Sequence, residues 1–464
     1  MLTPPTRTCR PARRLTRCRE RGRRKRRNPE PQQTLRERAI LVGLEVTGRG
    51  SRARPSEAEE SLEELAALAE SAGAEVIHHT LQSRPAPEAA TLIGSGKVEE
   101  IAERVRAARA DVVIFDHDLS PTQQRNLERT LGCKVIDRTQ LILDIFATRA
   151  RTREGQLQVE LAQLNYLLPR LTGRGKEMSR LGGGIGTRGP GETQLETDRR
   201  RIYRRIRKIR KELESVRLQR SVQRKQRQTV PLATAALVGY TNAGKSTLFN
   251  RLTGAGVLAD NRLFATLDPT MRLLVLPSRR RILLSDTVGF IRNLPPTLVE
   301  AFRATLEEVT EASLLLHVVD ASCPQAPQQA AEVVRVLAEL GAGQTPHVLV
   351  LNKIDRIPEA EAGMDALVRR IAGQAAVELE DRSVAISALT GQGLDRLLEI
   401  IDEALPLDPV TAARFRLPAG EGATLHLLHE FGRVSTIRYR DGCCEVEAEV
   451  PESLKRKLAE YLTE

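Results

Sequence analysis

A phosphate-binding motif at residues 239–247 constrains the fold of this chain more than any other sequence feature. The segment reads GYTNAGKST and matches the pattern G-x-x-x-x-G-K-[ST]. The apolar run 235–238 precedes it, and residues 248–252 have the pattern of a helix start. A buried strand, a glycine turn and a helix therefore follow one another in the order that phosphate binding requires. We predict nucleotide contacts from Gly239, Tyr240, Thr241, Asn242, Ala243, Gly244, Lys245, Ser246 and Thr247.

Two side chains of this phosphate-binding loop have specific expected roles. The glycines allow backbone N–H groups to surround phosphate oxygens, and the helix N-terminus adds its partial positive charge. Lys245 would reach the β- and γ-phosphates as a catalytic residue, and the hydroxyl of Ser246 would bind Mg²⁺. The loop therefore predicts a nucleoside triphosphate as the ligand and Mg²⁺ as its cofactor.

The segment NKID predicts that the nucleotide carries guanine. It follows the apolar run 348–351, which has the pattern of a buried parallel strand. The carboxylate of Asp355 can accept hydrogen bonds from guanine N1 and N2, and adenine lacks this donor pair. Asn352 would support the base edge and the loop, while the stem of Lys353 would pack on the base. A solvated turn at a strand end is the alternative for Asn352, Lys353, Ile354 and Asp355, but the upstream loop favours guanine.

Three further segments complete the predicted nucleotide site. After the apolar run 384–386, backbone N–H groups would bind guanine O6 from Ser387, Ala388 and Leu389. A second switch segment, DTVG, would hold Mg²⁺ through water and place a catalytic N–H against the γ-phosphate; it comprises Asp286, Thr287, Val288 and Gly289. A first switch segment, 264–270, would supply a threonine to the metal, with contacts from Phe264, Ala265, Thr266, Leu267 and Asp268.

Thr266 is our prediction for the threonine that binds the metal and acts in catalysis, with Thr270 as the second candidate. Both switch segments are of the kind that a γ-phosphate orders and that hydrolysis releases.

Phe290 follows the second switch segment where Ras-like enzymes place a glutamine that orients the attacking water. Because phenylalanine has no hydrogen-bonding group, we expect slow intrinsic hydrolysis, with another group completing the site. Asn242 resembles the asparagine of GTPases that use K⁺ in place of an arginine finger, or it only tolerates a tight turn.

Composition and charge indicate a multi-domain cytoplasmic protein without a membrane anchor. The chain has 464 residues, and no apolar run approaches the roughly 18–20 residues of a membrane helix. Its six cysteines show no C-x-x-C spacing, which favours a reducing compartment. Residues 1–34 hold twelve Arg/Lys against two Glu, and residues 199–227 hold fourteen against two, within a formal net charge of +12. The remainder is therefore acidic, and the two basic segments indicate binding to phosphate backbones.

The pattern along the chain predicts an α/β architecture with several domains. Residues 1–34 should be a disordered Arg-rich tail: a nucleic-acid arm, a transit peptide, or an over-extended or dispensable start. Residues 35–148 alternate strand and helix patterns and predict a small α/β domain with a mainly parallel sheet. Its loop 92–97 is either a second nucleotide site or a helix N-terminal turn. Residues 232–405 form the predicted nucleotide-binding domain with a mainly parallel sheet and helices on both faces, and 410–464 a small α+β domain with a hairpin at 441–442.

Residues 149–228 predict an antiparallel coiled-coil arm. The leucines at 157, 161, 164 and 168 follow heptad spacing, as do the apolar residues at 202, 206, 209, 213 and 216. A glycine-rich loop lies between the two runs, and its arginines lack local acidic partners. This loop is either a flexible linker or, as we prefer, a segment that folds against a partner such as RNA. Because aromatic residues are nearly missing, backbone and shape contacts should dominate any RNA recognition.

From about residue 36 onward the sequence resembles the HflX family of ribosome-associated GTPases. The motifs GYTNAGKS (239–246), FATLD (264–268), DTVG (286–289) and NKID (352–355) indicate only the superfamily. More specific are LIGSGK (92–97), DHDLSP (116–121), VIDRT (135–139) and LGGGIGTRGPGE (181–192). The resemblance does not extend over residues 1–34.

The resemblance implies a Mg²⁺-dependent GTPase that converts GTP to GDP and phosphate. It further implies binding to the large (50S) ribosomal subunit and its rRNA, with the glycine loop entering near the catalytic centre, and a role in splitting or rescuing ribosomes. Some family members are reported to hydrolyse ATP through the N-terminal domain. We expect a monomer whose turnover the ribosome stimulates. Two other functions stay open: an assembly factor for the large subunit, and an RNA-binding protein whose GTPase domain only gates affinity.

Overall fold

The computed structural model describes residues 36–463 with several gaps. Outside the described residues lie 1–35, 48–54, 172–189, 228–231, 256–262, 265, 293–307, 358–359, 376–381, 406–409, 419, 441 and 464. The predictions for the tail 1–34, for Ala265 and for most of the glycine-rich loop therefore fall outside the described part of the chain. Among the described residues, no helix is both long enough and apolar enough to span a lipid bilayer.

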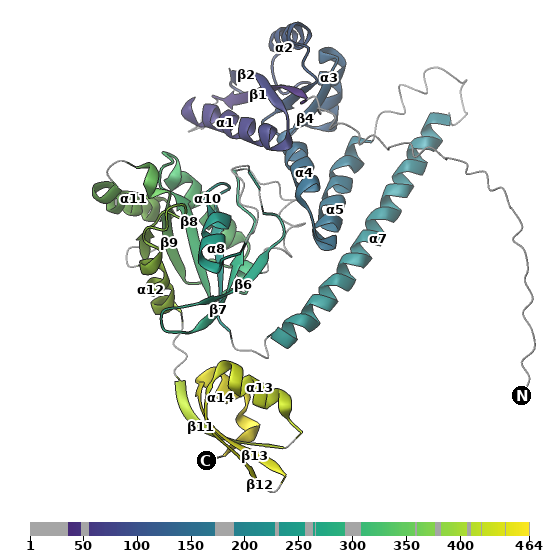
Figure 1. Ribbon diagram of the computed structural model, residues 1–464. Coiled ribbons are helices and arrows are strands. Elements are labelled where there is room, and N and C mark those ends of the chain that lie inside the picture. Colours follow the sequence, from purple (N-terminus) through teal and green to yellow (C-terminus); the bar gives the residue numbers. More distant parts are fainter. Residues whose placement is uncertain are drawn as a thin grey trace, which may run out of the picture. The chain divides into compact units, whose positions relative to one another are not determined.

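The N-terminal domain is a parallel four-stranded sheet covered by helices on both faces (Figure 1). The sheet has the order β2-β1-β3-β4, with β1 (Arg38–Val46), β2 (Glu75–Arg84), β3 (Val112–Phe115) and β4 (Lys134–Asp137). Alternate residues of β1 pack on opposite faces, as the pleat of a strand requires: Leu41 with one core and Ile40 with the other. One face is covered by α1 (Pro55–Ala72) and α4 (Arg138–Arg149), and the other by α2 (Ser95–Ala108) and α3 (Pro121–Leu131). The predicted α/β class with a parallel sheet is confirmed.

Two helices form the predicted arm, α5 (Arg153–Arg170) and α7 (Pro190–Arg227), and they pack side by side (Figure 1). Leu157 from α5 packs with Ile209 and Leu213 from α7, and Leu161 and Leu164 flank this cluster. These residues belong to the heptad seam, so the period of the apolar residues correctly predicted the contact.

The central domain contains a six-stranded sheet with the order β10-β9-β8-β5-β7-β6. Its strands are β5 (Thr234–Gly239), β6 (Thr270–Val275), β7 (Arg281–Asp286), β8 (Leu314–Asp320), β9 (His347–Asn352) and β10 (Ser383–Ala385). All neighbours are parallel except β6 and β7, which form an antiparallel pair. The helices are α8 (Lys245–Thr253), α10 (Ala326–Glu339), α11 (Ala360–Ala375) and α12 (Leu394–Ala404), with a 3₁₀ turn η2 (Ile354–Arg356). The carboxyl ends of β5, β7, β8 and β9 meet at one edge, where such sheets bind their ligands.

The C-terminal domain is a four-stranded sheet with the order β12-β13-β11-β14 and short helices. Its elements are β11 (Val410–Pro418), α13 (Gly422–Phe431), β12 (Arg433–Arg440), β13 (Cys443–Pro451), α14 (Glu452–Lys457), η3 (Ala459–Tyr461) and β14 (Leu462–Thr463). Strands β12 and β13 form the predicted hairpin, and Gly442 in its turn has a φ of +74°. Every second residue of β13 packs into the core of this domain.

Candidate nucleotide-binding site

The phosphate-binding loop joins the end of β5 to the start of α8, as the motif predicts. Gly239 has a φ of +149°, and a Cβ atom there would lie 2.2 Å from the carbonyl oxygen of Val318 on the neighbouring strand. Gly244 has a φ of +94° and precedes the first residue of α8. Both positions therefore need glycine for backbone reasons, which explains the spacing of the motif.

The ammonium group of Lys245 is hydrogen-bonded to the phosphate-binding loop itself. Its side chain is buried, and Nζ donates hydrogen bonds to the carbonyl oxygens of Gly239 (3.0 Å) and Tyr240 (2.7 Å). Burial lowers the pKa of Lys245 to about 8, which the nearby Asp286 carboxylate partly offsets. A Cβ atom on Gly289 would lie 3.0 Å from Nζ, so the backbone of the second switch segment closely approaches the lysine.

Three side-chain oxygens converge at the predicted metal position. The hydroxyl of Ser246 donates to Oδ2 of Asp286 at 2.7 Å, and Thr266 Oγ1 lies 2.8 Å from Ser246 Oγ and 3.0 Å from the same Oδ2. Asp286 is fully buried, and this burial raises the pKa of its carboxyl, against the effect of hydrogen bonds from Ser246 and Thr266. Within the described residues, Oδ1 of Asp286 has no hydrogen-bond partner. A cluster of oxygen donors with an unpartnered carboxylate oxygen fits Mg²⁺.

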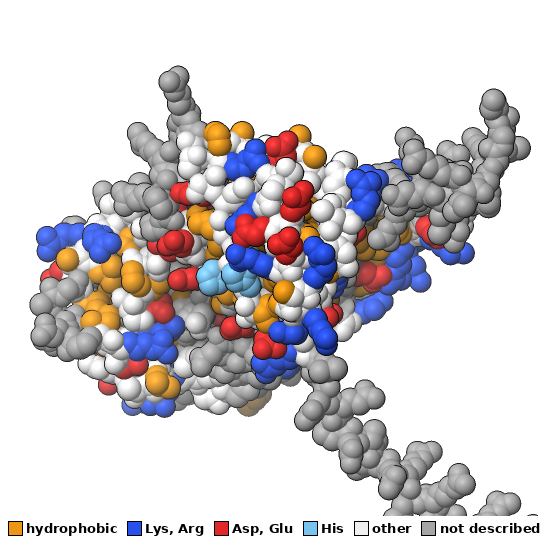
Figure 2. Space-filling model, turned by 90° about the horizontal axis from the view of Figure 1, so that it is seen from above, with side chains coloured by type: hydrophobic (Ala, Val, Ile, Leu, Met, Phe, Trp, Pro, Cys, Tyr) orange, Lys and Arg blue, Asp and Glu red, His pale blue; other side chains and the backbone are white. Residues whose placement is uncertain are grey.

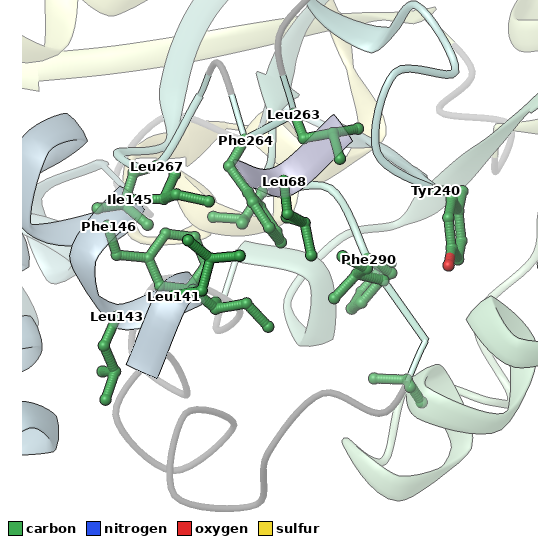
Figure 3. Close-up of a cluster of buried hydrophobic side chains, with 14 of the residues drawn as sticks. Leu68, Leu141, Leu143, Ile145, Phe146, Tyr240, Leu263, Phe264, Leu267 and Phe290 are labelled. Carbon is green, nitrogen blue, oxygen red and sulfur yellow. The ribbon is translucent and has the colours of Figure 1, made fainter. Parts of the chain in front are cut away.

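Of the two threonines that the sequence offered, Thr266 is the one brought to Ser246 and Asp286. Thr270 instead begins β6 and pairs with Asp286 in the sheet register. The side chains of Phe264 and Leu267 pack in a buried apolar cluster with residues of α4 (Figure 3), and the carboxylate of Asp268 is bonded to the start of α5. A nucleotide contact from these three positions would therefore have to use the backbone.

The second switch segment is fastened to the phosphate-binding loop by backbone hydrogen bonds. Phe290 N–H donates to the carbonyl of Gly239 at 3.1 Å, and its carbonyl accepts from Thr241 N–H at 2.7 Å. The hydroxyl of Thr287 donates to the carbonyl of Leu237 at 2.6 Å. A Cβ atom on Gly289 would lie 2.9 Å from Thr241 Cα, so only glycine allows this approach. The arrangement places the Gly289 backbone beside the loop, as expected for a γ-phosphate contact.

The side chain of Phe290 does not occupy the place of a water-orienting residue. It is 3% exposed and lies in the apolar cluster that also contains Leu68 and Phe264 (Figure 3). Because the ring is buried in this cluster, position 290 contributes to folding in this chain. The structure thus gives a packing reason for the departure from the Ras-like pattern.

The base-binding residues lie at the ends of β9 and β10. Asn352 is buried; its Nδ2 donates to the carbonyl of Ala243 at 2.8 Å, and its Oδ1 accepts from Ala388 N–H at 2.9 Å. The hydroxyl of Ser387 donates to Oδ1 of Asp355 at 2.5 Å. Asp355 is exposed, as is Leu389, whereas Ile354 is buried under the site. The carboxylate that should select guanine is therefore accessible, and a bound base itself would have to shield it from water.

Two groups of site residues were missed by sequence reasoning. Asp320 ends β8, and its Oδ2 accepts a hydrogen bond from Lys353 Nζ at 2.6 Å. An acidic residue at the end of an apolar strand is the sequence pattern that could have indicated this position.

Glu64 and Arg138 contact the site from the N-terminal domain. The hydroxyl of Tyr240 donates to Glu64, and Arg138 donates to Glu64 at 2.5 Å and to the carbonyl of Arg292 at 3.3 Å. Arg138 belongs to the VIDRT motif, which carried no predicted role.

The chain is similar to known protein families and to individual relatives. Three family models match the chain: "GTP-binding GTPase N-terminal" over residues 59–147, "GTP-binding GTPase Middle Region" over 149–227 and "50S ribosome-binding GTPase" over 234–353. A GTPase HflX from Caldanaerobacter subterraneus is 47% identical over 426 residues, covering 92% of this chain and 94% of the relative. The chain belongs to the HflX family of GTPases. The HflX protein of Escherichia coli is 49% identical over 363 residues, covering 78% of this chain and 83% of the relative.

Membership in the HflX family establishes the reaction: the chain is a GTPase. Among solved structures, a GTP-binding protein from Sulfolobus solfataricus in complex with GDP is 28% identical, with a TM-score of 0.43 over 79% of this chain and 98% of that chain.

Proposed function

We propose that this HflX-family GTPase binds the large ribosomal subunit through its arm and splits or rescues ribosomes, with Mg²⁺ as cofactor and hydrolysis stimulated by the ribosome. The basic arm is the observation that carries this proposal. Residues 199–227 of α7 hold fourteen Arg/Lys against two Glu, and at 199–211, where the structure describes the side chains, none of the basic residues is buried. Such a concentration of positive charge suits a phosphate backbone. On the central part of the face in Figure 2, by contrast, acidic and basic side chains are interspersed.

A groove between the two arm helices has the chemistry to bind RNA. It measures about 700 Å³ and is lined by Asn165, Leu168, Arg200, Tyr203, Arg204, Ile206, Arg207 and Arg210. Within the described part of the chain, Arg204, Arg207 and Arg210 form no ion pair, so their charge is available to a partner. Tyr203 is 43% exposed beside them and offers a surface for stacking a base. The family model for the central domain carries the words "50S ribosome-binding", which also supports a ribosomal partner.

The residues at the nucleotide site divide the work of hydrolysis. Lys245 is held by two carbonyl groups and would bind the β- and γ-phosphates, while the Gly289 N–H would contact the γ-phosphate. Ser246, Thr266 and Asp286 would hold Mg²⁺, directly or through water. When bound, the metal neutralises charge on the phosphates. Since Phe290 packs into the apolar cluster, it cannot orient the attacking water, and a ribosomal contact would have to complete the site.

The test is GTP turnover by the full chain with and without purified large subunits, beside a Lys245→Ala control. We expect slow turnover alone, stimulation by orders of magnitude, and loss of both in the control. Stimulation should fall steeply with added salt because the arm's contacts are electrostatic. Turnover of about 1 s⁻¹ or faster without ribosomes would contradict the role given to Phe290. Unchanged turnover with large subunits would remove the ribosomal partner from the proposal.

Splitting needs its own measurement, because a large-subunit assembly factor would dock similarly. Mature 70S ribosomes incubated with the protein and GTP should lose their 70S fraction in a sucrose gradient. Deleting 173–191 should abolish splitting while leaving RNA affinity largely intact, since α7 keeps its charge. A 70S fraction that stays constant would favour the assembly role. RNA affinity that depends on the nucleotide, without any splitting, would favour a GTP-gated RNA-binding protein.

A further inference from the structure

Asp268, in the first switch segment, is hydrogen-bonded to the beginning of arm helix α5. Its Oδ2 accepts from the N–H groups of Arg151 and Thr152 at 2.9 Å each, and its Oδ1 accepts from the Thr152 hydroxyl. Thr152 is the N-cap of the helix and lies 116 residues from Asp268 in the sequence. N–H groups at a helix N-terminus lack helical partners, and the helix dipole favours a carboxylate there.

Gly155 leaves room for this carboxylate. A Cβ atom at position 155 would lie 2.7 Å from Asp268 Oδ1 and 3.1 Å from Thr152 Oγ1. Gly155 also donates its N–H to Thr152 Oγ1 at 3.0 Å. Glycine destabilises a helix relative to alanine, so Gly155 in the first turn lowers the stability of α5. The close approach of the switch carboxylate accounts for it.

Only Leu267 separates Asp268 from Thr266, the threonine at the predicted metal position. The Thr266 hydroxyl lies 2.8 Å from Ser246 Oγ and 3.0 Å from Asp286 Oδ2. Leu267 is 2% exposed and lies in the apolar cluster with Ile145 (Figure 3). The residue that would bind the metal and the residue hydrogen-bonded to the beginning of the arm helix are thus joined by one short piece of chain, buried at Thr266 and Leu267.

The other end of this piece is fixed by the N-terminal domain. The ring of Phe264 packs edge-on against Phe146, with 4.6 Å between ring centroids (Figure 3), and Leu263 N–H donates to the Ser71 hydroxyl at 3.1 Å. Phe264 has a φ of +58°, a strained conformation for an aromatic residue, which persists because its neighbours hold it. The first switch segment is therefore clamped from outside the central domain on both sides of Thr266.

We propose that Asp268 is a positioning residue for GTP hydrolysis: by its hydrogen bonds to Arg151 and to the N-cap Thr152 it holds Thr266 against Ser246 and Asp286. Coupling of this kind is reciprocal. A γ-phosphate and metal that order Thr266 strengthen the attachment of α5, and a pull on α5 withdraws Thr266. The proposal rests on the GTPase activity of the chain and is independent of the ribosomal role.

The test compares GDP with a non-hydrolysable GTP analogue on the full-length Asp268→Ala variant, in the presence of Mg²⁺ and without ribosomes. GDP has no γ-phosphate to order the switch segments, so its affinity should stay within about twofold. The affinity for the GTP analogue should fall roughly tenfold, equivalent to about 1.4 kcal/mol, with a similar fall in kcat. Asp268→Asn keeps one acceptor oxygen and should give an intermediate loss.

A second variant perturbs the same contact from the arm. Gly155→Ala leaves every group of the switch segment in place but puts a methyl group against Asp268, so it should reproduce the selective loss of GTP-analogue affinity. Leu164→Ala is the matched control. Leu164 flanks the α5–α7 seam, so the substitution should weaken the arm, and the side chain forms no hydrogen bond with Asp268. Its GTP-to-GDP preference should equal that of the wild type.

Three results would overturn the proposal. Equal losses of GDP and GTP-analogue affinity would make Asp268 a purely structural cap. The same selective loss in Leu164→Ala would assign the effect to arm stability in general. Unchanged affinities in both Asp268→Ala and Gly155→Ala would remove the coupling. If Asp268→Ala fails to bind GDP at all and is unfolded, Asp268→Asn and Gly155→Ala decide by the same criteria.

Discussion

A Cβ atom on Gly244 would lie 2.2 Å from Nδ2 of Asn352, which links the phosphate-binding loop to the base-binding segment. The same Nδ2 donates to the carbonyl of Ala243, and Asn352 Oδ1 accepts from the N–H of Ala388. One buried amide therefore connects the loop after β5, the end of β9 and the segment after β10. Phosphate binding and base binding are parts of one rigid structure.

Gly244→Ala should abolish tight nucleotide binding. The added methyl group would displace Asn352, and the φ of +94° costs a non-glycine residue about 1–2 kcal/mol. We expect GDP affinity to fall at least about tenfold, measured with a fluorescent GDP derivative. Gly254→Ala is the control, because φ there is +65° but a Cβ would meet nothing within 4 Å. Equal GDP affinities for the two variants would contradict the role of the Asn352 contact.

Asp355→Asn should change the preferred base from guanine to xanthine. Asparagine cannot accept both guanine N–H bonds, but its amide can donate to the oxygen that xanthine carries at C2. Hydrogen bonds to a charged group contribute about 1.5–3 kcal/mol, so GTP affinity should fall roughly 10- to 150-fold while XTP affinity rises. Competition binding with GTP and XTP measures the change. Parallel losses for both nucleotides would show that the exposed Asp355 does not read the base.

Asn242→Gly separates the two interpretations of Asn242. The residue has a φ of +60°, which glycine adopts freely, so GDP affinity should stay near the wild-type value. If the amide helps to hold K⁺, the turnover of the variant in KCl should fall to its level in NaCl. That result, measured with saturating large subunits, would favour the K⁺ role. Wild-type turnover that is equal in the two salts would restrict Asn242 to its conformational role.

Phe290→Gln should not create a faster enzyme, although it restores the Ras-like residue. The side chain at position 290 faces the apolar cluster, so the amide would be buried without a partner rather than placed beside the nucleotide. We expect no gain in intrinsic turnover and a loss of about 3 kcal/mol in the free energy of unfolding. Phe290→Leu should cost less, about 1–1.5 kcal/mol. A marked rise in ribosome-free turnover for Phe290→Gln would show that the ring can leave the cluster.

The sequence alone was sufficient to predict those parts of the site that depend on residues close together in the chain. The glycines at 239 and 244 act through their own backbone angles, and Asn352 follows an apolar strand, so each could be recognised from its neighbours in the chain. The heptad seam of the arm was predictable for the same reason, because the period of apolar residues determines which helix face is buried. These features depend on separations of a few residues.

Contacts between distant segments could not be predicted in this way. The Tyr240 hydroxyl meets Glu64, 176 residues away, and Asp268 meets Thr152, 116 residues away. Asp268 lies in the FATLD motif, from which we predicted a contact with the nucleotide. Its carboxylate is instead hydrogen-bonded to the beginning of arm helix α5. Only the tertiary arrangement shows that such polar residues join domains.

Substitution of His317 should make the protein less sensitive to acid. His317 is 1% exposed on β8, and both ring nitrogens lack hydrogen-bond partners among the described residues. Burial lowers its pKa to about 3, with smaller effects from His347 and Lys245, so the ring is neutral in the folded protein. In the unfolded chain it takes up a proton below about pH 6.5. Its contribution to stability is therefore complete above pH 6.5 and is lost progressively as the pH falls towards 3.

At pH 5 this difference in pKa should lower the free energy of unfolding by about 2 kcal/mol relative to pH 8. His317→Leu removes the titrating group and leaves an apolar side chain of similar size. The decrease in the free energy of unfolding from pH 8 to pH 5 should therefore be about 2 kcal/mol smaller in the variant than in the wild type. Urea unfolding of both proteins at the two pH values measures it. His347 is present in both proteins, so its titration contributes to both pH profiles. An identical pH dependence in wild type and variant would mean that His317 is solvated or protonated in the folded state.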